Sequence, residues 1–327
     1  MPRLNYGTLL ENLVVLECVR MCLEHVTPVG PPLGFVTSFA MPALTECWRK
    51  PTEEAGSPWF SHEYLLSLTL EPYPSDSLQG IWSLCLNNAP KLPVARYYQR
   101  EGLLVYPSAG PNGALLAAML AVESGRPIAL WTNDDAERYA VDTGRAGDSA
   151  RRQDPLAAAG ALLGADTKGT TTSETGLFPA TISHLDEWLL AGAGKGTTVR
   201  VGFLDPDNYA EGSTQVSPGD HRRWLRVLAA GGVGVLSVMF SGCQNRGPGN
   251  AARDARLASF HADEVDSYPD SLVFELGSFQ TGVKIRWPEE SRSAAVADLR
   301  QRIEAVWRGW HPLMHALTVH RNGLPSA

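Results

Sequence analysis

The sequence lacks any hydrophobic run long enough to cross a membrane. No apolar stretch among its 327 residues approaches the roughly 18 that a membrane-spanning helix requires. No secretory signal is visible at the N-terminus either. Hydrophobic residues nevertheless make up 44% of the chain, which is enough to bury a sizeable core. The sequence therefore predicts a globular, cytoplasmic protein with no membrane partner.

Cysteine is scarce, odd in number and without any Cys-x-x-Cys pair. The five cysteines are Cys18, Cys22, Cys47, Cys85 and Cys243. This pattern does not fit a disulfide framework and favours reduced thiols. Cys18 and Cys22 lie four residues apart on a predicted helix, but no second pair of metal ligands accompanies them. We therefore expect them to pack in the core rather than to bind zinc.

The chain also lacks an excess of positive charge. Its 28 lysines and arginines face 35 acidic residues, so the net charge is −7 and the whole molecule does not attract a polyanion. A nucleic-acid partner would need a local basic patch. The candidates are Arg222 and Arg223 in HRRWLR (221–226), and Arg151 and Arg152. The alternative interpretation is a solvated helix face.

Several catalytic motifs are missing. GAGKGTT (192–198) has glycine where a phosphate-binding loop needs serine or threonine, and it follows a predicted helix instead of a strand. A glycine stop to that helix is the better interpretation. Ser241 lacks the flanking glycines of a hydrolase elbow. No histidine or cysteine spacing indicates a metal site, so we expect none.

The pattern that is present alternates predicted helices with buried strands. Helices are predicted at 7–25, 114–125, 184–194, 217–232 and 293–310. Gly125 is expected to close the second of these, and Ser217 followed by Pro218 is expected to cap the fourth. Strands are predicted at 34–44, 126–135, 197–209, 233–242, 271–279 and 281–288. This alternation predicts an α/β fold with a Rossmann-like, mostly parallel sheet flanked by helices and a C-terminal antiparallel hairpin. We expect one domain over 1–327, with insertions at about 50–80 and 142–176 and a C-terminal helical extension from about 290.

Three of the predicted strands have polar ends, at 38–42, 133–135 and 205–209. In open α/β sheets, ligands bind beyond the carboxyl ends of the strands, where the strand order reverses. The most informative stretch is VGFLDPDNY (201–209). An acid and an amide there can orient an exocyclic amino group, and a tyrosine can stack on a base. The alternative is a polar turn that Asp205 and Asp207 cap and Pro206 fixes.

The order of these segments resembles a known fold. VYPSAGPNGALLAAML (105–120), IALWTNDD (128–135), FLDPDNY (203–209) and the hairpin FELGSFQTGVKIRWP (274–288) occur in the order of the class I S-adenosylmethionine-dependent methyltransferase fold. They most resemble the bacterial family that methylates adenine N6 in large-subunit ribosomal RNA. The resemblance spans roughly residues 5–290, outside the two expected insertions.

The resemblance implies S-adenosylmethionine as the cofactor and specific residues for each role. The implied cofactor-binding residues are Ser38, Ala40, Asn133, Asp134 and Asp205. The implied catalytic residues are Asp205, Asn208 and Tyr209. The sequence departs from the family in two places. The family's first strand reads Asp-Thr-His-Ala-Gly-Ala-Gly, and its acid and both of its glycines are absent at 37–43. In the fourth strand, Asp207-Asn208 replace the second proline of the family's Asp-Pro-Pro-Tyr.

Three functions follow from these patterns. The first is S-adenosylmethionine-dependent methylation of nucleic acid or a nucleobase, with Asp205 and Asn208 orienting the acceptor and Tyr209 stacking on it. The second is a cofactor-free binding or scaffold protein of the same fold. The third is a nucleic-acid-modifying transferase, as in DNA hypermodification, that uses another donor.

Overall fold

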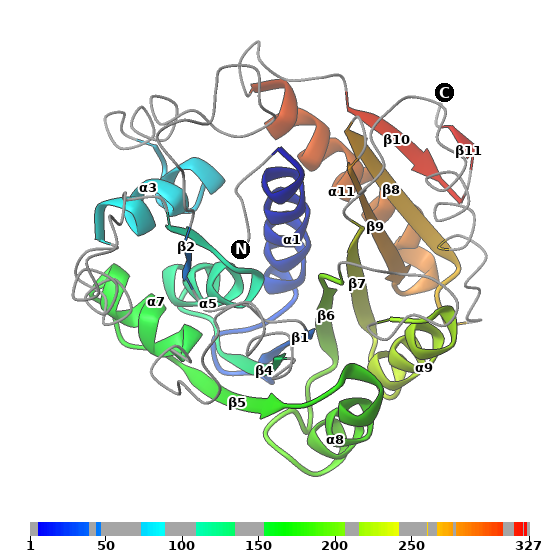
Figure 1. Cartoon of the computed structure of the whole chain (residues 1–327), viewed down its shortest axis with the longest axis horizontal. Helices are drawn as coiled ribbons and strands as arrows, with labels where there is room; N and C mark the ends of the chain where they lie inside the picture. Colours follow the sequence, from blue (N-terminus) through cyan, green and yellow to red (C-terminus); the bar gives the residue numbers. More distant parts are fainter. Residues whose placement is uncertain are drawn as a thin grey trace.

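A mixed sheet with helices on both faces forms the centre of the molecule (Figure 1). The structure is a computed structural model that describes residues 6–38, 44–46, 73–88, 109–134, 154–206, 216–241, 260, 267–276, 279–309, 317–322 and 324–325. Its helices are α1 (Tyr6–Glu24), α3 (Leu78–Asn88), α5 (Gly113–Glu123), α7 (Pro155–Leu163), α8 (Phe178–Leu190), α9 (Pro218–Ala229) and α11 (Glu289–Gly309).

The strands of the main sheet are β1 (Leu33–Ser38), β4 (Ile128–Asp134), β5 (Gly169–Thr175), β6 (Val199–Leu204), β7 (Gly234–Ser241), β8 (Asp270–Leu276), β9 (Phe279–Arg286), β10 (Thr318–Arg321) and β11 (Leu324–Pro325). Their order across the sheet is β11-β10-β8-β9-β7-β6-β1-β4-β5. Two short strands, β2 (Leu44–Glu46) and β3 (Ala109–Pro111), pair separately.

The α/β class and the C-terminal hairpin are confirmed, but the expected proportion of parallel pairing is wrong. The run β7-β6-β1-β4-β5 is parallel throughout. The other four neighbouring pairs, from β7–β9 to β10–β11, are antiparallel. Antiparallel strands need no long crossover, so the short links after β8 and β10 allow this half of the sheet to form from consecutive segments.

Two strands of the main sheet, β5 and β10, lie where the sequence predicts no strand. Residues 142–176 were expected to be an insertion, yet β5 in this segment pairs with β4 along its whole length. Its sequence GTTTSET has no apolar alternation, and most of its side chains are exposed or half-exposed, so the hydrophobic pattern gave no signal. The C-terminal segment was expected to be helical after 290, but β10 follows α11 and pairs with β8.

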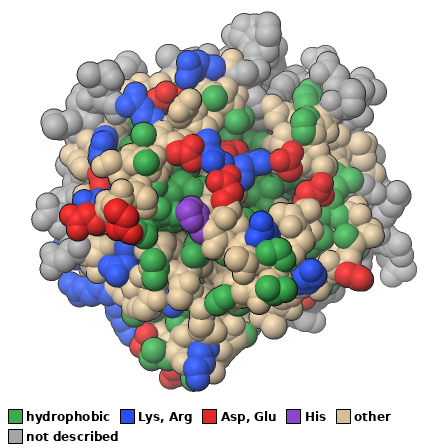
Figure 2. Space-filling model, turned by 180° about the vertical axis from the view of Figure 1, so that it is seen from behind, with side chains coloured by type: hydrophobic (Ala, Val, Ile, Leu, Met, Phe, Trp, Pro, Cys, Tyr) green, Lys and Arg blue, Asp and Glu red, His purple; other side chains and the backbone are tan. Residues whose placement is uncertain are grey.

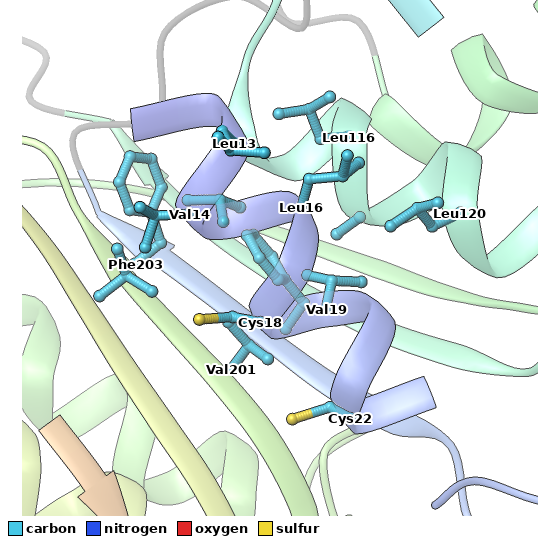
Figure 3. Packing of buried hydrophobic residues seen from close by; sticks show 14 of the residues in the cluster. Leu13, Val14, Leu16, Cys18, Val19, Cys22, Leu116, Leu120, Val201 and Phe203 are labelled. Carbon is cyan, nitrogen blue, oxygen red and sulfur yellow. The ribbon is translucent and has the colours of Figure 1, made fainter. Parts of the chain in front are cut away.

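The helices divide between the two faces of the sheet. One hydrophobic core joins α1, α3, α5, α7 and α11 to one face, and a second joins α8 and α9 to the other. Helix α1 is buried almost all round, and the sheet curves around it (Figure 1). Figure 3 shows Leu13 and Leu16 of α1 facing Leu116 and Leu120 of α5. Helix α1 is therefore an interior element that fixes the neighbouring strand ends.

Local signals place the helix ends as expected. Ser217 accepts a hydrogen bond from the Asp220 backbone and Asp220 reciprocates, which forms a capping box at the start of α9. Helix α5 ends at Glu123, and Gly125 follows with a φ of 63°. No helix among the described residues is both long and apolar enough to cross a membrane.

Candidate functional site

The candidate site lies at the carboxyl ends of β1, β4 and β6. The chain runs from β1 to β4 and β5 on one side, then returns to β6 and β7 on the other side of β1. The strand order therefore reverses between β1 and β6, which is the position where open α/β sheets bind ligands. In this register, Ser38 pairs with Asn133 of β4 and with Leu204 of β6, directly before Asp205.

Ser38 and Asn133 are joined by a direct hydrogen bond. The Asn133 amide donates to Ser38 Oγ at 2.9 Å and to the Gly176 carbonyl at 3.1 Å. Both side chains are buried, with 0% and 1% of their surface exposed. Asn133 Oδ1 is also buried and accepts no hydrogen bond, whereas buried polar atoms are ordinarily paired. The end of β4 therefore holds an acceptor that a ligand donor would satisfy.

Asp205 follows β6 on the α1 side of the sheet. Val201 and Phe203 belong to the core that contains α1, and side chains alternate between faces along a strand, so Asp205 continues their face. Its side chain is half-buried. Burial raises the pKa of the Glu11 carboxyl on α1 well above its ordinary value, and the negative charge of Asp205 raises this pKa further. Glu11 and Asp205 are thus electrostatic neighbours.

The first turn of α5 also packs against this strand end. Asn112 caps α5 by accepting a hydrogen bond from the Leu115 backbone at 2.8 Å. Gly113 lies so close to Phe203 of β6 that a Cβ atom would approach the Phe203 ring to 2.7 Å. Glycine therefore allows α5 to begin beside the end of β6.

Helix α1 is tied to the same turn by a polar contact. The amide of Asn12, which is 2% exposed, donates to the Pro111 carbonyl at 3.4 Å. Pro111 directly precedes the cap of α5. Elements α1, β3 and α5 therefore meet close to the end of β6, which Asp205 follows.

The structure brings three of the predicted site residues to one edge of the sheet, but not to one face. Ser38 and Asn133 share the face that carries Val36 and Trp131, which α8 and α9 cover, whereas Asp205 lies on the α1 face. They do not form one continuous cofactor-binding surface, because Ser38 and Asn133 alternate in phase with residues of the core under α8 and α9, and Asp205 with residues of the core around α1. The backbone of Asp134 ends β4. Ala40, Asn208 and Tyr209 lie outside the described residues.

Sequence reasoning missed Glu11 and Asn12. Both are buried polar residues within an otherwise apolar helix, since Leu9, Leu10 and Leu13 surround them in sequence. Two adjacent polar residues inside such an apolar run are costly to bury unless their groups find partners. Their presence in this run is therefore the feature of the sequence that could have indicated a site. Only the folded structure shows that Glu11 is near Asp205.

Arg222 and Arg223 lie on the outward side of α9. Arg222 is half-exposed and Arg223 is exposed, while His221 and Trp224 on the inward side are buried. Arg223 donates to the Pro179 carbonyl of α8 at 3.3 Å. Helix α9 begins after β6, so these residues lie toward the carboxyl edge of the sheet. Figure 2 shows positive and negative side chains interspersed on the face in view.

The remaining candidate groups in the described part of the chain have structural roles. Cys18, Cys22 and Cys85 are free and fully buried, and burial raises the pKa of each thiol, which opposes reactivity. Lys195 lies between α8 and β6, at the opposite edge of the sheet from the site. Among the described residues, no three histidine, cysteine or acidic side chains come together in a metal-binding group.

No protein-family model matches the chain, and no curated protein matches it. Among solved structures, the crystal structure of a Legionella pneumophila protein with the family model DUF519 is similar. The comparison gives a TM-score of 0.48 and 12% identity, and covers 95% of this chain and 96% of the other. A likeness of this strength assigns neither a family nor a function.

Proposed function

We propose that the chain is a group-transfer enzyme that methylates an amino group of nucleic acid or a nucleobase, with S-adenosylmethionine as the donor. The observation that carries the proposal is the reversal of strand order between β1 and β6, which puts Asp205 at the position where such sheets bind ligands. The hairpin β8–β9 beside β7 also agrees with the resemblance to the methyltransferase fold. Fold alone does not give chemistry, so the argument depends on the site residues.

The residues at the end of β4 are compatible with a nucleoside cofactor. Asn133 Oδ1 is a buried acceptor without a partner, and a ribose hydroxyl or an adenine amino group is a donor. Ser38, which accepts a hydrogen bond from Asn133, would lie beside the bound cofactor, and Asp134 follows Asn133 at the end of β4. The bound cofactor would supply a methyl group on a positively charged sulfur.

Asp205 would act on the acceptor. Its carboxylate would accept hydrogen bonds from an exocyclic amino group and hold the nitrogen in line with the methyl carbon, since proximity and orientation supply much of the rate enhancement. Asp205 would take the proton that this nitrogen loses when the cofactor's methyl group is transferred to it, while the cofactor's sulfur would keep the electron pair of the carbon–sulfur bond. Asn208 and Tyr209 would complete the acceptor pocket.

The first experiment is calorimetric titration with S-adenosylmethionine and S-adenosylhomocysteine. We expect both to bind, and no heat with either would count against the proposed function. Transfer of a labelled methyl group would then be measured on single-stranded oligonucleotides containing adenine and cytosine. Asp205→Asn should lower transfer by at least about 100-fold, in the range of catalytic hydrogen-bonding groups. Asp166→Asn, at an exposed position far along the chain, is the matched control.

The proposed binding of nucleic acid is tested by measuring how its affinity depends on salt concentration. Each phosphate contact contributes to the slope of log K against log salt, so replacing Arg222 and Arg223 with alanine should make the slope shallower. Arg308→Ala removes an exposed positive charge on α11 and serves as the control. An unchanged slope in the double variant would assign these arginines to a solvated helix face. If S-adenosylmethionine binds but no methyl group is transferred to any oligonucleotide, the result would instead support a binding protein of this fold.

A further inference from the structure

The two edges of the main sheet differ in length and composition. Among the described strands, one edge is β11, which has two residues, includes Pro325 and follows the four-residue β10. Short strands, prolines and charged side chains are the usual means by which proteins stop an edge from pairing with another chain. The other edge is β5, whose seven residues GTTTSET include one charge, Glu174, and no proline. The β5 edge therefore has little to prevent the addition of another strand.

Strand β5 is also regular, and its side chains are accessible. It pairs with β4 residue by residue from Gly169 to Thr175, without a bulge, and it lies at the end of the sheet (Figure 1). Most of its side chains are exposed or half-exposed. A regular, accessible edge strand is a template for a further strand.

The direction of the backbone groups of β5 follows from its pairing with β4. Ile128 of β4 donates its backbone N–H to the Lys168 carbonyl at 3.0 Å. Backbone groups of successive residues in a strand point to opposite sides, so Thr171 and Ser173 direct theirs away from β4. Within the described part of the chain, no residue bonds to this outer row. Thr171 and Ser173 therefore each offer one donor and one acceptor to a neighbouring strand.

Helices on both faces of the sheet hold β5 in this geometry. Thr171 Oγ1 donates to Oδ1 of Asp154, the cap of α7, at 2.7 Å. On the other face, Nε1 of Trp188 in α8 donates to Thr172 Oγ1 at 3.1 Å. An edge that is already ordered loses little conformational freedom when a partner binds.

Strand β5 is self-complementary in an antiparallel register centred on Thr172. In this register, Thr171 of each copy lies opposite Ser173 of the other copy. Both residues direct their backbone groups outward, so each of these two pairs exchanges two hydrogen bonds. The two Thr172 side chains meet at the centre, and threonine is favourable both within strands and in cross-strand pairs.

The same register also brings opposite charges together. Glu174 of one copy lies opposite Thr170 of the second copy, and Lys168 is two residues from Thr170 on the same face. Such diagonal neighbours are about 7–8 Å apart, within reach of long side chains. Lys168 is exposed and contacts the Gly125 carbonyl at 3.5 Å, while the Glu174 carboxylate lies 3.7 Å from Nδ1 of the exposed His184. These surface contacts leave both charges able to meet across the two-fold axis.

The charge match favours a second copy over an unrelated strand as the occupant of this edge. The net charge of −7 makes copies repel each other at long range, so their association needs matched local contacts. Two-fold pairing uses β5 of both copies and leaves β11 as the edge at each end. The assembly is therefore closed at two copies, as in most homo-oligomers.

We propose that β5 pairs with β5 of a second copy and joins the two sheets into one continuous sheet. This proposal is independent of the proposed methyl transfer. The two-fold axis runs between the two Thr172 residues, perpendicular to the sheet. The carboxyl ends of the strands in the two copies therefore point in opposite directions, and each copy keeps its own candidate site open.

Sedimentation velocity of the full chain over a wide range of concentration tests for the dimer. We expect a reversible shift from monomer to dimer as the concentration rises. Ser173→Pro removes an outward N–H from each copy and should raise the dissociation constant at least about 30-fold. Ser173→Ala loses the same side-chain contact with Thr132 but keeps this N–H, and should change the constant less than about 3-fold.

Two results of this experiment would overturn the proposal. A protein that stays monomeric at every concentration would leave the β5 edge to a strand of another protein. A dimer that Ser173→Pro does not weaken would have to form through another surface.

An exchange of charges gives a test that does not depend on how the proline variant folds. Lys168→Glu and Glu174→Lys should each raise the dissociation constant roughly 10-fold, because like charges then meet across the two-fold axis. An equal mixture of these two variants should recover the affinity of the wild type, because opposite charges meet again. Lys195→Glu, at an exposed position before β6, is the control and should leave the affinity unchanged. A mixture that does not recover would overturn the proposed pairing.

Amide hydrogen exchange locates the surface that the second copy covers. Peptides from β5 should exchange early in dilute protein and more slowly in concentrated protein. Peptides from β10, near the opposite edge, should exchange alike at both concentrations. Slower exchange at another segment, without any change at β5, would show that the copies associate elsewhere and would contradict the proposal.

Discussion

At the scale of single residues, the site is defined by polar groups in places where polarity is costly. Glu11 and Asn133 have 6% and 1% of their surface exposed, and the buried Asn133 Oδ1 accepts no hydrogen bond. Natural cores keep such groups where they orient a neighbour or meet a ligand. These two residues are therefore stronger candidates for a functional role than the exposed arginines of α9.

The raised pKa of Glu11 predicts how stability depends on pH. The folded protein holds this proton more tightly than the unfolded chain, so this group costs no stability below its ordinary pKa of 4.5. As pH rises above 4.5 toward the folded pKa, the unfolded chain releases the proton first and stability falls. Glu11→Gln removes this effect. The free energy of unfolding, measured in urea from pH 4 to 9, should therefore fall less steeply with pH in Glu11→Gln than in the wild type.

The control for this prediction is Glu290→Gln, an exposed acid at the start of α11. Its curve should run parallel to that of the wild type. Parallel curves for the wild type and Glu11→Gln would show that Glu11 titrates alike in the folded and unfolded chain, contrary to its burial.

Asn133 gives a second prediction at this scale. Asn133→Ala removes the hydrogen bonds to Ser38 Oγ and the Gly176 carbonyl, and leaves Ser38 Oγ buried without this donor. Leaving buried polar groups unpaired costs about 1–3 kcal/mol, so the free energy of unfolding in urea should fall by that amount. Asn87→Ala, at an exposed position, should change it by less than about 0.5 kcal/mol. Equal effects in the two variants would contradict the buried role of Asn133.

At the scale of elements, helices are positioned by what happens at their ends. Helix α9 begins with the Ser217–Asp220 capping box and ends against a buried guanidinium. Arg200 of β6 donates to the Leu228 carbonyl at 2.8 Å and to the Ala230 carbonyl at 2.6 Å. Burial lowers the pKa of Arg200, while the last carbonyls of α9 gain the donors that a helix end lacks. The helix that carries Arg222 and Arg223 is thereby fixed at both ends.

Replacing Arg200 with methionine tests this arrangement. Arg200→Met keeps most of the side-chain volume but leaves the carbonyls of Leu228 and Ala230 without a donor. We expect the free energy of unfolding to fall by about 1–3 kcal/mol, because the carbonyl of the buried residue Leu228 is left without its donor. Arg226→Met on the exposed side of the same helix should change it by no more than about 0.5 kcal/mol. Urea denaturation compares the two variants, and similar losses would mean that α9 does not depend on this cap.

At the scale of the whole molecule, the sheet is stable at its centre and weaker at its edges. Strand β1 is completely buried and pairs with β4 and β6 on its two sides. Strand β5 is hydrogen-bonded to β4 on one side, and most of its side chains are exposed or half-exposed. Since local opening is easiest where little apolar surface is buried, the site lies on the most stable strands.

Amide hydrogen exchange measured by mass spectrometry tests this order. Peptides from β1 and β6 should exchange last, with rates that follow global unfolding. Peptides from β5 and β10 should exchange earlier. Protection of β5 equal to that of β1 would contradict the edge position of β5.

The sequence by itself determined the α/β class, the buried central strands, the caps of α5 and α9, and the C-terminal hairpin. Each depends on local chemistry: apolar periodicity, a serine before a proline, a glycine after a helix. It also marked Asp205 correctly as the end of a buried strand. Strands β5 and β10 were not predicted, because their sequences GTTTSET and TVHR have no hydrophobic period to detect.

Only the tertiary structure decided which strand ends and which faces meet. Strand order put Ser38, Asn133 and Asp205 at one edge, while the alternation of side chains placed Asp205 on the opposite face from the other two. The proximity of Glu11 to Asp205 depends on packing between segments almost 200 residues apart. Periodicity carries no information about such contacts, because the register between a helix and a distant strand is set by the packing of the complete core.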